Sequence, residues 1–209
     1  MTKAEEYDEI ANGVFIELFP IVARRILDET RFGGGSCLDL GAGGGHLGIA
    51  LAKACRDLSV TLADLSPDAV GIAERRVAEQ GLEDRVKAVV ADVHDLPFAD
   101  GAFDLVASRG SVWFWKDQAK ALAEIARVLK PRGVAFIGGG FGNAATKARI
   151  ASAMLAREPD WPERVRGFRG GTTGASLKEH FESCGAHARV IDDECGLWVV
   201  ASPSAEAFE

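Results

Sequence analysis

The strongest chemical signal in the sequence is an aspartate followed by closely spaced glycines, in the segment Asp39-Leu40-Gly41-Ala42-Gly43-Gly44-Gly45. Asp39 belongs to a short apolar stretch that is typical of a buried strand, and Gly41, Gly43 and Gly45 alternate before a helical pattern begins. Glycine allows a sharp turn and a close approach of the backbone to a ligand. The segment therefore predicts a loop that cradles a nucleotide or nucleoside.

Two ligand classes fit this loop. The residues from Gly43 to Gly48 match the G-x-G-x-x-G pattern of dinucleotide-binding folds. Such folds place the first glycine directly after the strand, and counting from Gly41 puts His46 where a close-packed glycine or alanine belongs. The dinucleotide interpretation, and with it an NAD-dependent oxidoreductase, is therefore strained, but it stays open at this point.

Two further aspartates follow predicted strands. Asp64 lies 19 residues beyond Gly45, at a strand end from which a carboxylate can accept hydrogen bonds from two ribose hydroxyls. Its alternative role is a helix cap, although Ser66 is better placed for that. Asp92 follows another apolar run, where it could bind the exocyclic amine of adenine or remain a solvated loop carboxylate.

The elements that must position these residues alternate between strand and helix. Apolar runs predict strands over residues 37–40, 60–63, 86–91, 103–108 and 134–138. Helical spacing predicts helices over 46–55, 67–80 and 117–129. This alternation implies right-handed crossovers and a mostly parallel sheet covered by helices on both faces.

The two ends and one internal segment depart from the alternation. Residues 1–35 form a helical cap, in which Gly13 and Pro20 separate two helices, and 36–140 form the cofactor-binding core. Residues 141–175 are predicted to be an insertion or lid, with a helix near 150–156 and a loop rich in Trp, Pro, Arg and Gly. Residues 176–209 hold a helix over 177–184 and strands over 188–191 and 197–201, which suit an antiparallel hairpin.

The expected fold class is therefore α/β. We expect a Rossmann-like, doubly wound, seven-stranded mixed sheet with an antiparallel C-terminal hairpin. All 209 residues form a single domain with an N-terminal helical cap.

Taken together, these strand ends resemble the class I S-adenosylmethionine-dependent methyltransferases, in particular the small-molecule branch known as methyltransferase type 11. Residues 92–98, the strand around Phe103-Asp104 and the helix that ends at Lys130-Pro131 are similar to later segments of that family. The resemblance covers about residues 37–140. The chain departs from the family at Arg132, where a second glycine is usual, and in the insertion.

The resemblance implies S-adenosylmethionine as the cofactor and in-line methyl transfer to a small-molecule acceptor. Asp39 would then hold the cofactor's amino group, Asp64 its ribose, and Asp92 with Val93 its adenine. An acidic pocket suits a ligand that carries a sulfonium and an ammonium group but no phosphate. The implied cofactor-binding residues are Asp39, Gly41, Ala42, Gly43, Gly45, Asp64, Leu65, Asp92, Val93 and Ser108.

The acceptor side is expected after the fourth strand, at Arg109, Trp113 and Trp115. Each has an alternative role, because such aromatics often belong to the core and an arginine often forms an ordinary salt bridge. No catalytic residue is assigned, although His46 and His94 lie beside the proposed loops. The missing base leaves open a non-catalytic protein that binds S-adenosylmethionine or a nucleoside, as a sensor or pseudoenzyme.

Composition narrows the possible partners. The net charge of −7 argues against a protein whose main role is to bind nucleic acid. A polar, acidic start and the lack of any apolar run near ~20 residues predict a cytoplasmic protein with no membrane segment. The cysteines, at positions 37, 55, 184 and 195, form no C-x-x-C pair, so we expect no metal site. Oligomeric state is not encoded in any pattern that we identify.

Overall fold

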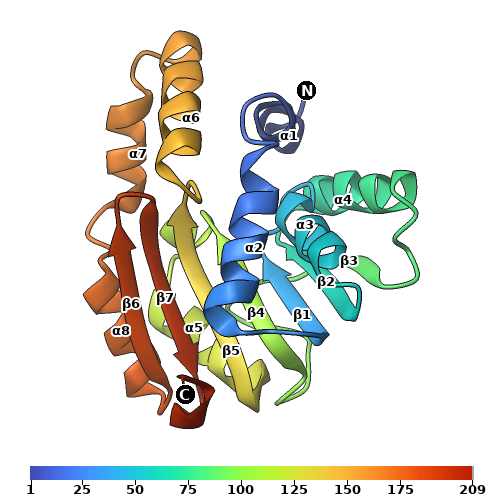
Figure 1. Ribbon diagram of the computed structural model, residues 1–209, viewed down its shortest axis with the longest axis vertical. Coiled ribbons are helices and arrows are strands. Elements are labelled where there is room, and N and C mark those ends of the chain that lie inside the picture. Colours follow the sequence, from blue (N-terminus) through green and yellow to red (C-terminus); the bar gives the residue numbers. More distant parts are fainter. Residues whose placement is uncertain (209) are drawn as a thin grey trace.

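The computed structural model describes residues 1–208, the side chains of Phe168 and Arg169 excepted, so the last residue of the predicted 176–209 segment lies outside it. Its centre is a seven-stranded sheet with the order β3-β2-β1-β4-β5-β7-β6 (Figure 1). The strands are β1 (Gly35–Leu40), β2 (Leu58–Asp64), β3 (Val86–Val90), β4 (Phe103–Arg109), β5 (Leu129–Gly140), β6 (His187–Asp193) and β7 (Gly196–Ser202). The first five strands are parallel, whereas β7 runs antiparallel to both β5 and β6. The predicted mixed sheet with a terminal hairpin is confirmed.

The order of the strands locates the place where a ligand can enter. From β1 the chain moves outward to β2 and β3, then returns to the other side of β1 to form β4. The crossovers on the two sides of β1 therefore diverge at the carboxyl ends of β1 and β4. In open α/β sheets this switch point leaves a crevice, and ligands bind there.

Both faces of the sheet are covered because successive strand residues point to opposite sides. Cys37 packs into a cluster with α2 (Leu18–Thr30), α3 (His46–Ala54) and α4 (Pro67–Glu79). Leu38 packs into a second cluster with α5 (Gln118–Val128) and α8 (Gly174–Ser183). The fold is thus doubly wound, as the alternating pattern predicted.

The N-terminal cap is two helices, α1 (Lys3–Gly13) and α2. Thr2 and Glu5 form a capping box that begins α1, and the helix ends at Gly13. Pro20 does not separate the helices, contrary to the sequence pattern. It lies in the first turn of α2, where a missing N–H costs no helical hydrogen bond.

The segment after β5 holds two helices, α6 (Ala144–Arg157) and α7 (Trp161–Arg169), where the sequence predicted one helix and a loop. Asn143 caps α6, and Pro162 occupies the first turn of α7, a position that favours proline. Trp161 packs edge-on against Phe141, with ring centroids 6.3 Å apart. Helices α6 and α7 stand beyond the carboxyl ends of the parallel strands, at the same end of the molecule as α1 (Figure 1).

Two short 3₁₀ helices, η1 (Val112–Phe114) and η2 (Ala205–Phe208), complete the described elements. None of the helices within residues 1–208 has the length and apolar character needed to cross a membrane.

Gly48 controls how closely α3 approaches the sheet. A Cβ at this position would overlap the Leu62 side chain on β2 and would lie 3.0 Å from Val60 Cγ1. We expect Gly48→Ala to lower the free energy of unfolding by about 1–3 kcal/mol, because the helix must shift to admit the methyl group. Thermal melts of the purified variant measure this effect.

Gly71→Ala is the matched control, because Gly71 lies in α4 and its nearest neighbour to a new Cβ is 3.7 Å away. This change should stabilise the protein by up to about 1 kcal/mol through helix propensity. Equal melting temperatures for the two variants would contradict the close packing at Gly48.

Candidate active site

The carboxyl ends of β1, β2 and β4 border a cavity of about 630 Å³. It brings together eight of the predicted site residues: Gly41, Gly43, Asp64, Leu65, Asp92, Val93, Arg109 and Trp115. A much smaller cavity of about 20 Å³ shares Tyr7, Gly41 and Arg109 with it and adds Asp39, Ala42 and His46. Gly45, Ser108 and Trp113 line neither cavity.

The glycine loop has a backbone that only glycine adopts easily. Gly41, Gly43 and Gly45 have φ values of 64°, 53° and 83°, all in the left-handed region. A Cβ on Gly41 would also overlap the Ser111 side chain. Gly45 does not reach the cavity, but it directly precedes α3 and so turns the chain into that helix.

Asp64 ties this loop to the end of β2. Its Oδ2 accepts a hydrogen bond from the Gly43 amide at 2.8 Å, and its Oδ1 accepts one from the Ser66 amide at 2.9 Å. Ser66 caps α4 through its own hydroxyl, which accepts a bond from the Ala69 amide. The capping role is therefore filled by Ser66, and the Asp64 carboxylate lies at the cavity.

Asp39 is the most buried carboxyl of the site, with 1% of its surface exposed. Its Oδ2 accepts a hydrogen bond from the Gly48 amide at 2.8 Å. Burial raises the pKa of Asp39 to about 7, the Gly48 bond opposes the shift, and the Asp64 charge adds to it. A cation close to this carboxyl would lower its pKa, so that the carboxyl would be ionised at neutral pH.

Asp92 is half exposed and bonded to His94. It accepts hydrogen bonds from the His94 amide at 2.9 Å and from Nδ1 at 2.6 Å, and these bonds hold the pKa of Asp92 below its usual value. The other ring nitrogen of His94 accepts a bond from the Asp117 amide at 3.3 Å. Both nitrogens of His94 are thus engaged within the protein.

His46 is packed at the start of α3. Its ring stacks on Phe19 with centroids 4.8 Å apart, and its Nε2 lies 3.0 Å from Asn12 Oδ1. Burial is the main cause that lowers the pKa of His46 to about 4, so the ring is neutral near pH 7. Its Nε2–H then donates to Asn12, which makes His46 part of the packing between α1, α2 and α3.

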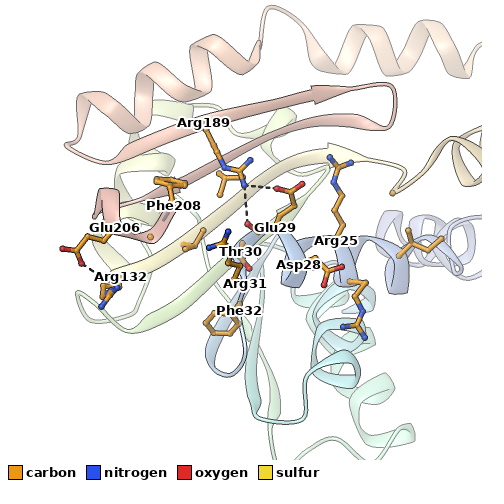
Figure 2. A pocket seen from close by; sticks show the side chains of 16 residues that line it. Arg25, Asp28, Glu29, Thr30, Arg31, Phe32, Arg132, Arg189, Glu206 and Phe208 are labelled. Carbon is orange, nitrogen blue, oxygen red and sulfur yellow. Dashed lines mark hydrogen bonds and ion pairs between the residues drawn. The ribbon is translucent and has the colours of Figure 1, made fainter.

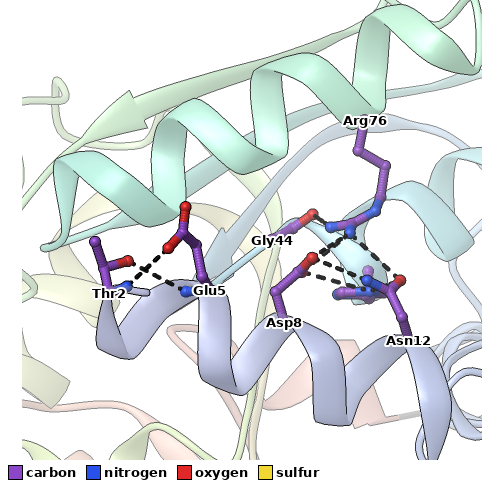
Figure 3. Close-up of polar contacts among 7 residues, drawn as sticks. Thr2, Glu5, Asp8, Asn12, Gly44 and Arg76 are labelled. Atoms are coloured by element: carbon purple, nitrogen blue, oxygen red, sulfur yellow. Dashed lines mark hydrogen bonds and ion pairs between the residues drawn. The ribbon is translucent and has the colours of Figure 1, made fainter.

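A polar network holds α1 against the glycine loop (Figure 3). Arg76 on α4 donates to the Gly44 carbonyl and to both carboxylate oxygens of Asp8, at 3.0 and 2.8 Å. This anchor brings Tyr7 to the cavity, where its ring lies 3.6 Å from the place of a Cβ on Gly43. Sequence reasoning missed Tyr7, because no local pattern shows that α1 lies over the loop.

Of the residues at the end of β4 and directly after it, some support the turn and others line the cavity. The Ser108 hydroxyl is buried and lies 2.5 Å from the Ser111 hydroxyl, which donates to the Leu40 carbonyl. Ser108 thus supports the turn rather than facing the cavity. Trp113 packs against Gly139, whereas Trp115 lines the cavity.

A larger groove of about 940 Å³ lies elsewhere, between α2, β5 and the C-terminal residues (Figure 2). Its arginines are largely matched by carboxylates: Arg189 pairs with Glu29 at 2.9 Å, and Arg25 with Asp193 at 2.6 Å. It does not include the predicted site residues. Among the described residues, moreover, no three metal-ligating side chains gather as a metal site would require.

Comparisons with known proteins identify the family. The family model described as a methyltransferase domain matches residues 38–137. A solved structure of a putative S-adenosyl-L-methionine-dependent methyltransferase from Methanococcus maripaludis is 37% identical, with a TM-score of 0.91 over 96% of this chain and 92% of that one. The chain belongs to the S-adenosylmethionine-dependent methyltransferases.

Curated relatives of this methyltransferase match it over a shorter stretch. A demethylmenaquinone methyltransferase of Thermus thermophilus is 41% identical over 46% of this chain and 43% of its own length. A ubiquinone/menaquinone biosynthesis C-methyltransferase of Rickettsia massiliae is 35% identical over 46% of this chain and 40% of its own. This chain therefore spans less than half the length of these curated relatives.

The cavity of this methyltransferase fits the family's cofactor, S-adenosylmethionine. The carboxyls of Asp39, Asp64 and Asp92, at or just beyond the ends of β1, β2 and β3, complement a ligand with two positive charges and hydroxyls. Leu65 and Phe114 line the cavity with 67% and 61% of their surfaces exposed, and the flat apolar faces of a purine would cover such side chains.

The raised pKa of Asp39 leads to a prediction about pH. Because its carboxyl is protonated below about pH 7, we expect the affinity of the wild type for S-adenosylmethionine to fall about tenfold per pH unit from 7 to 5. Asp39→Asn can still accept the Gly48 hydrogen bond but cannot ionise. Calorimetry should show weaker binding by the variant above pH 7 and a much flatter pH profile.

The same carboxyl affects the stability of the ligand-free protein. The folded pKa of about 7 exceeds the ordinary value of 3.8, so the stability that the proton provides is complete below pH 3.8 and lost as pH rises through 7. Asp39→Asn should therefore melt higher than the wild type at pH 8, whereas the exposed control Asp68→Asn should not. Identical melts of Asp39→Asn and wild type at pH 8 would contradict the buried, raised pKa.

Proposed function

We propose that this protein transfers a methyl group from S-adenosylmethionine to a small-molecule acceptor. The observation that carries the proposal is the arrangement of carboxyls at the ends of β1, β2 and β3 around a glycine loop. It occurs in a chain that is 37% identical, over nearly all of its length, to a putative methyltransferase.

Within this proposal each cofactor-binding residue has a role. Asp39 binds the ammonium group, and Asp64 accepts hydrogen bonds from the ribose hydroxyls. Asp92 and the Val93 backbone bind adenine, with Leu65 packed against the ring. Gly41, Ala42, Gly43 and Gly45 shape the loop under the methionine part, while Ser108 acts only by supporting Ser111.

The bound cofactor supplies a methyl group on a sulfonium centre, which is transferred in line to a nucleophile. The protein's own contribution is to align the two reactants and exclude water. Tyr7 and Trp115 border the cavity and provide walls for this purpose. His46 and His94 are already engaged in hydrogen bonds, so neither is assigned as a general base.

The acceptors of the curated relatives are not carried over to this chain. Their names refer to menaquinone or ubiquinone precursors and biosynthesis, but each similarity covers less than half of either chain. A cytoplasmic location and the absence of a nucleic-acid partner stay predictions of the sequence.

Product formation tests the proposed function. Incubation with S-adenosylmethionine and a panel of small nucleophiles should yield S-adenosylhomocysteine faster than the acceptor-free reaction for at least one member. Asp64→Ala is the matched low-affinity control. Tight cofactor binding without product from a broad panel of phenols, amines, thiols and carboxylic acids would favour a non-catalytic binding protein instead.

Asp64 provides the sharpest test of the cofactor site. Hydrogen bonds to a charged group contribute ~1.5–3 kcal/mol each, so Asp64→Ala should weaken S-adenosylmethionine binding by roughly ten- to a hundredfold. Part of this loss of affinity comes from the glycine loop, because the Gly43 amide loses its hydrogen-bond acceptor. Asp64→Asn should lose less affinity than Asp64→Ala. Turnover at saturating cofactor should change far less than the Michaelis constant for the cofactor.

Asp68→Ala is the control for Asp64→Ala, because Asp68 is an exposed residue in the first turn of α4, outside the cavity lining. Calorimetry on both folded variants measures the affinities. Wild-type affinity in Asp64→Ala would overturn the assignment of the cofactor site.

A further inference from the structure

Arg109 is a cation at the carboxyl end of β4 that has no carboxylate partner among the described residues. Its Nε donates to the Gly140 carbonyl at 3.2 Å, and its guanidinium carbon lies 5.5 and 5.7 Å from the ring centroids of Phe15 and Phe19. Burial lowers the pKa of Arg109, and the electrostatic interaction and hydrogen bond with the Tyr7 side chain oppose that shift. No carboxylate among the described residues lies within ion-pair distance of this guanidinium, although Asp39 lines the same small cavity.

Arg76 and Arg127, which are also partly buried, pair with carboxylates, whereas the partly buried Arg85 donates to three backbone carbonyls away from this cavity. Arg76 contacts Asp8 at 2.8 Å, and Arg127 contacts Glu124 at 2.7 Å. A charge removed from water without a counter-ion destabilises a protein, so an unpaired arginine at a cavity indicates a missing anion. The ordinary salt bridge that the sequence left open for Arg109 does not occur among the described residues.

The position of Arg109 separates it from the nucleoside end of the site. Asp64 ends β2 and Asp92 lies just beyond β3, on one side of the switch point, whereas Asp39 in β1 lines the small cavity together with Arg109. Arg109 is the last residue of β4 and is hydrogen-bonded to the last residue of β5, on the other side. A ligand that pairs with its guanidinium therefore lies across the glycine loop from the adenine-binding residues.

We propose that Arg109 binds the carboxylate of the methyl acceptor, which makes the acceptor a small carboxylic acid. This inference rests on the proposed function. The planar guanidinium fork matches a carboxylate with two parallel hydrogen bonds, and Nε is already used by Gly140. The terminal N–H groups are the donors for the acceptor.

The cavity also restricts the body of the acceptor. Tyr7 and Trp115 line the same cavity as Arg109, so the acid carries an apolar and preferably aromatic body. A volume of about 630 Å³ that must also hold the cofactor leaves room for a small molecule only.

The test compares acids with their own amides. Hydroxybenzoates and aminobenzoates, each paired with the corresponding benzamide, are titrated into protein saturated with S-adenosylhomocysteine and are assayed as methyl acceptors. We expect at least one acid to bind about tenfold or more tightly than its amide. Arg109→Gln should weaken binding of that acid by about ten- to a hundredfold and leave the amide unchanged.

Two further variants separate charge from geometry. Arg109→Lys keeps the charge without the fork and should recover only part of the preference for the acid. Arg75→Gln removes an exposed arginine of α4 outside this cavity and should change nothing. Thermal melts of all variants identify any that fail to fold, and Arg109→Lys then provides the comparison.

The outcomes are distinguishable from failure of the proposed function. If no acid of the panel binds more tightly than its amide, the inference is overturned. If Arg109→Gln weakens cofactor binding itself by tenfold or more, the guanidinium holds the cofactor's own carboxylate, which also overturns it. If an acid binds more tightly than its amide but no S-adenosylhomocysteine forms, the anion site at Arg109 is supported and the proposed methyl transfer is contradicted.

Discussion

The loop between β1 and α3 is held from two sides by aspartate carboxyls, and the geometry of the whole cavity follows from these contacts. Asp64, at the end of β2, accepts a hydrogen bond from the Gly43 amide. Asp39, in β1, accepts one from the Gly48 amide. Within the described residues, neither amide has a backbone partner of its own, because Gly43 lies in the loop and Gly48 in the first turn of α3. Because Gly48 has no side chain, α3 can approach β1 and β2 closely enough for the second bond.

The burial of Asp39 has two opposite effects: it lowers the stability of the ligand-free protein and strengthens the attraction for a cationic ligand. A carboxyl so far from water is expensive to ionise, which is why its pKa rises to about 7. The same burial strengthens its attraction for a cationic ligand in a region of low dielectric. Above about pH 7 the ligand-free protein is therefore less stable than it would be with a neutral residue at this position, and within the proposed function the bound cofactor offsets this loss.

Within the proposed function, the acceptor side and the cofactor side of the cavity differ in charge. Aspartates gather around the ends of the first three strands, whereas Arg109 ends β4 and aromatic side chains follow it. Helix α1 borders both sides, since Arg76 fixes it to the loop and Tyr7 lines the cavity together with Arg109. Within the proposed function, this contact links the position of α1 to both the cofactor loop and the anion site.

The sequence by itself determined the sheet, the glycine loop and the aspartates at the strand ends, because these depend on local signals. Apolar runs mark the strands, and glycines mark turns with left-handed φ values. Helix α7 escaped prediction because Trp161 and Pro162 resemble a loop until Pro162 is seen in a first helical turn. Leu129 likewise joined β5 instead of the preceding helix.

Only the tertiary structure decided what these residues do in combination. It buried Asp39, engaged both candidate histidines, placed Trp115 at the cavity and set Trp113 against Gly139. It also brought Tyr7 of the N-terminal cap to the same cavity as Arg109 at the end of β4. Such pairings depend on contacts between segments distant in the chain, and burial and charge at a site arise from those contacts rather than from local spacing.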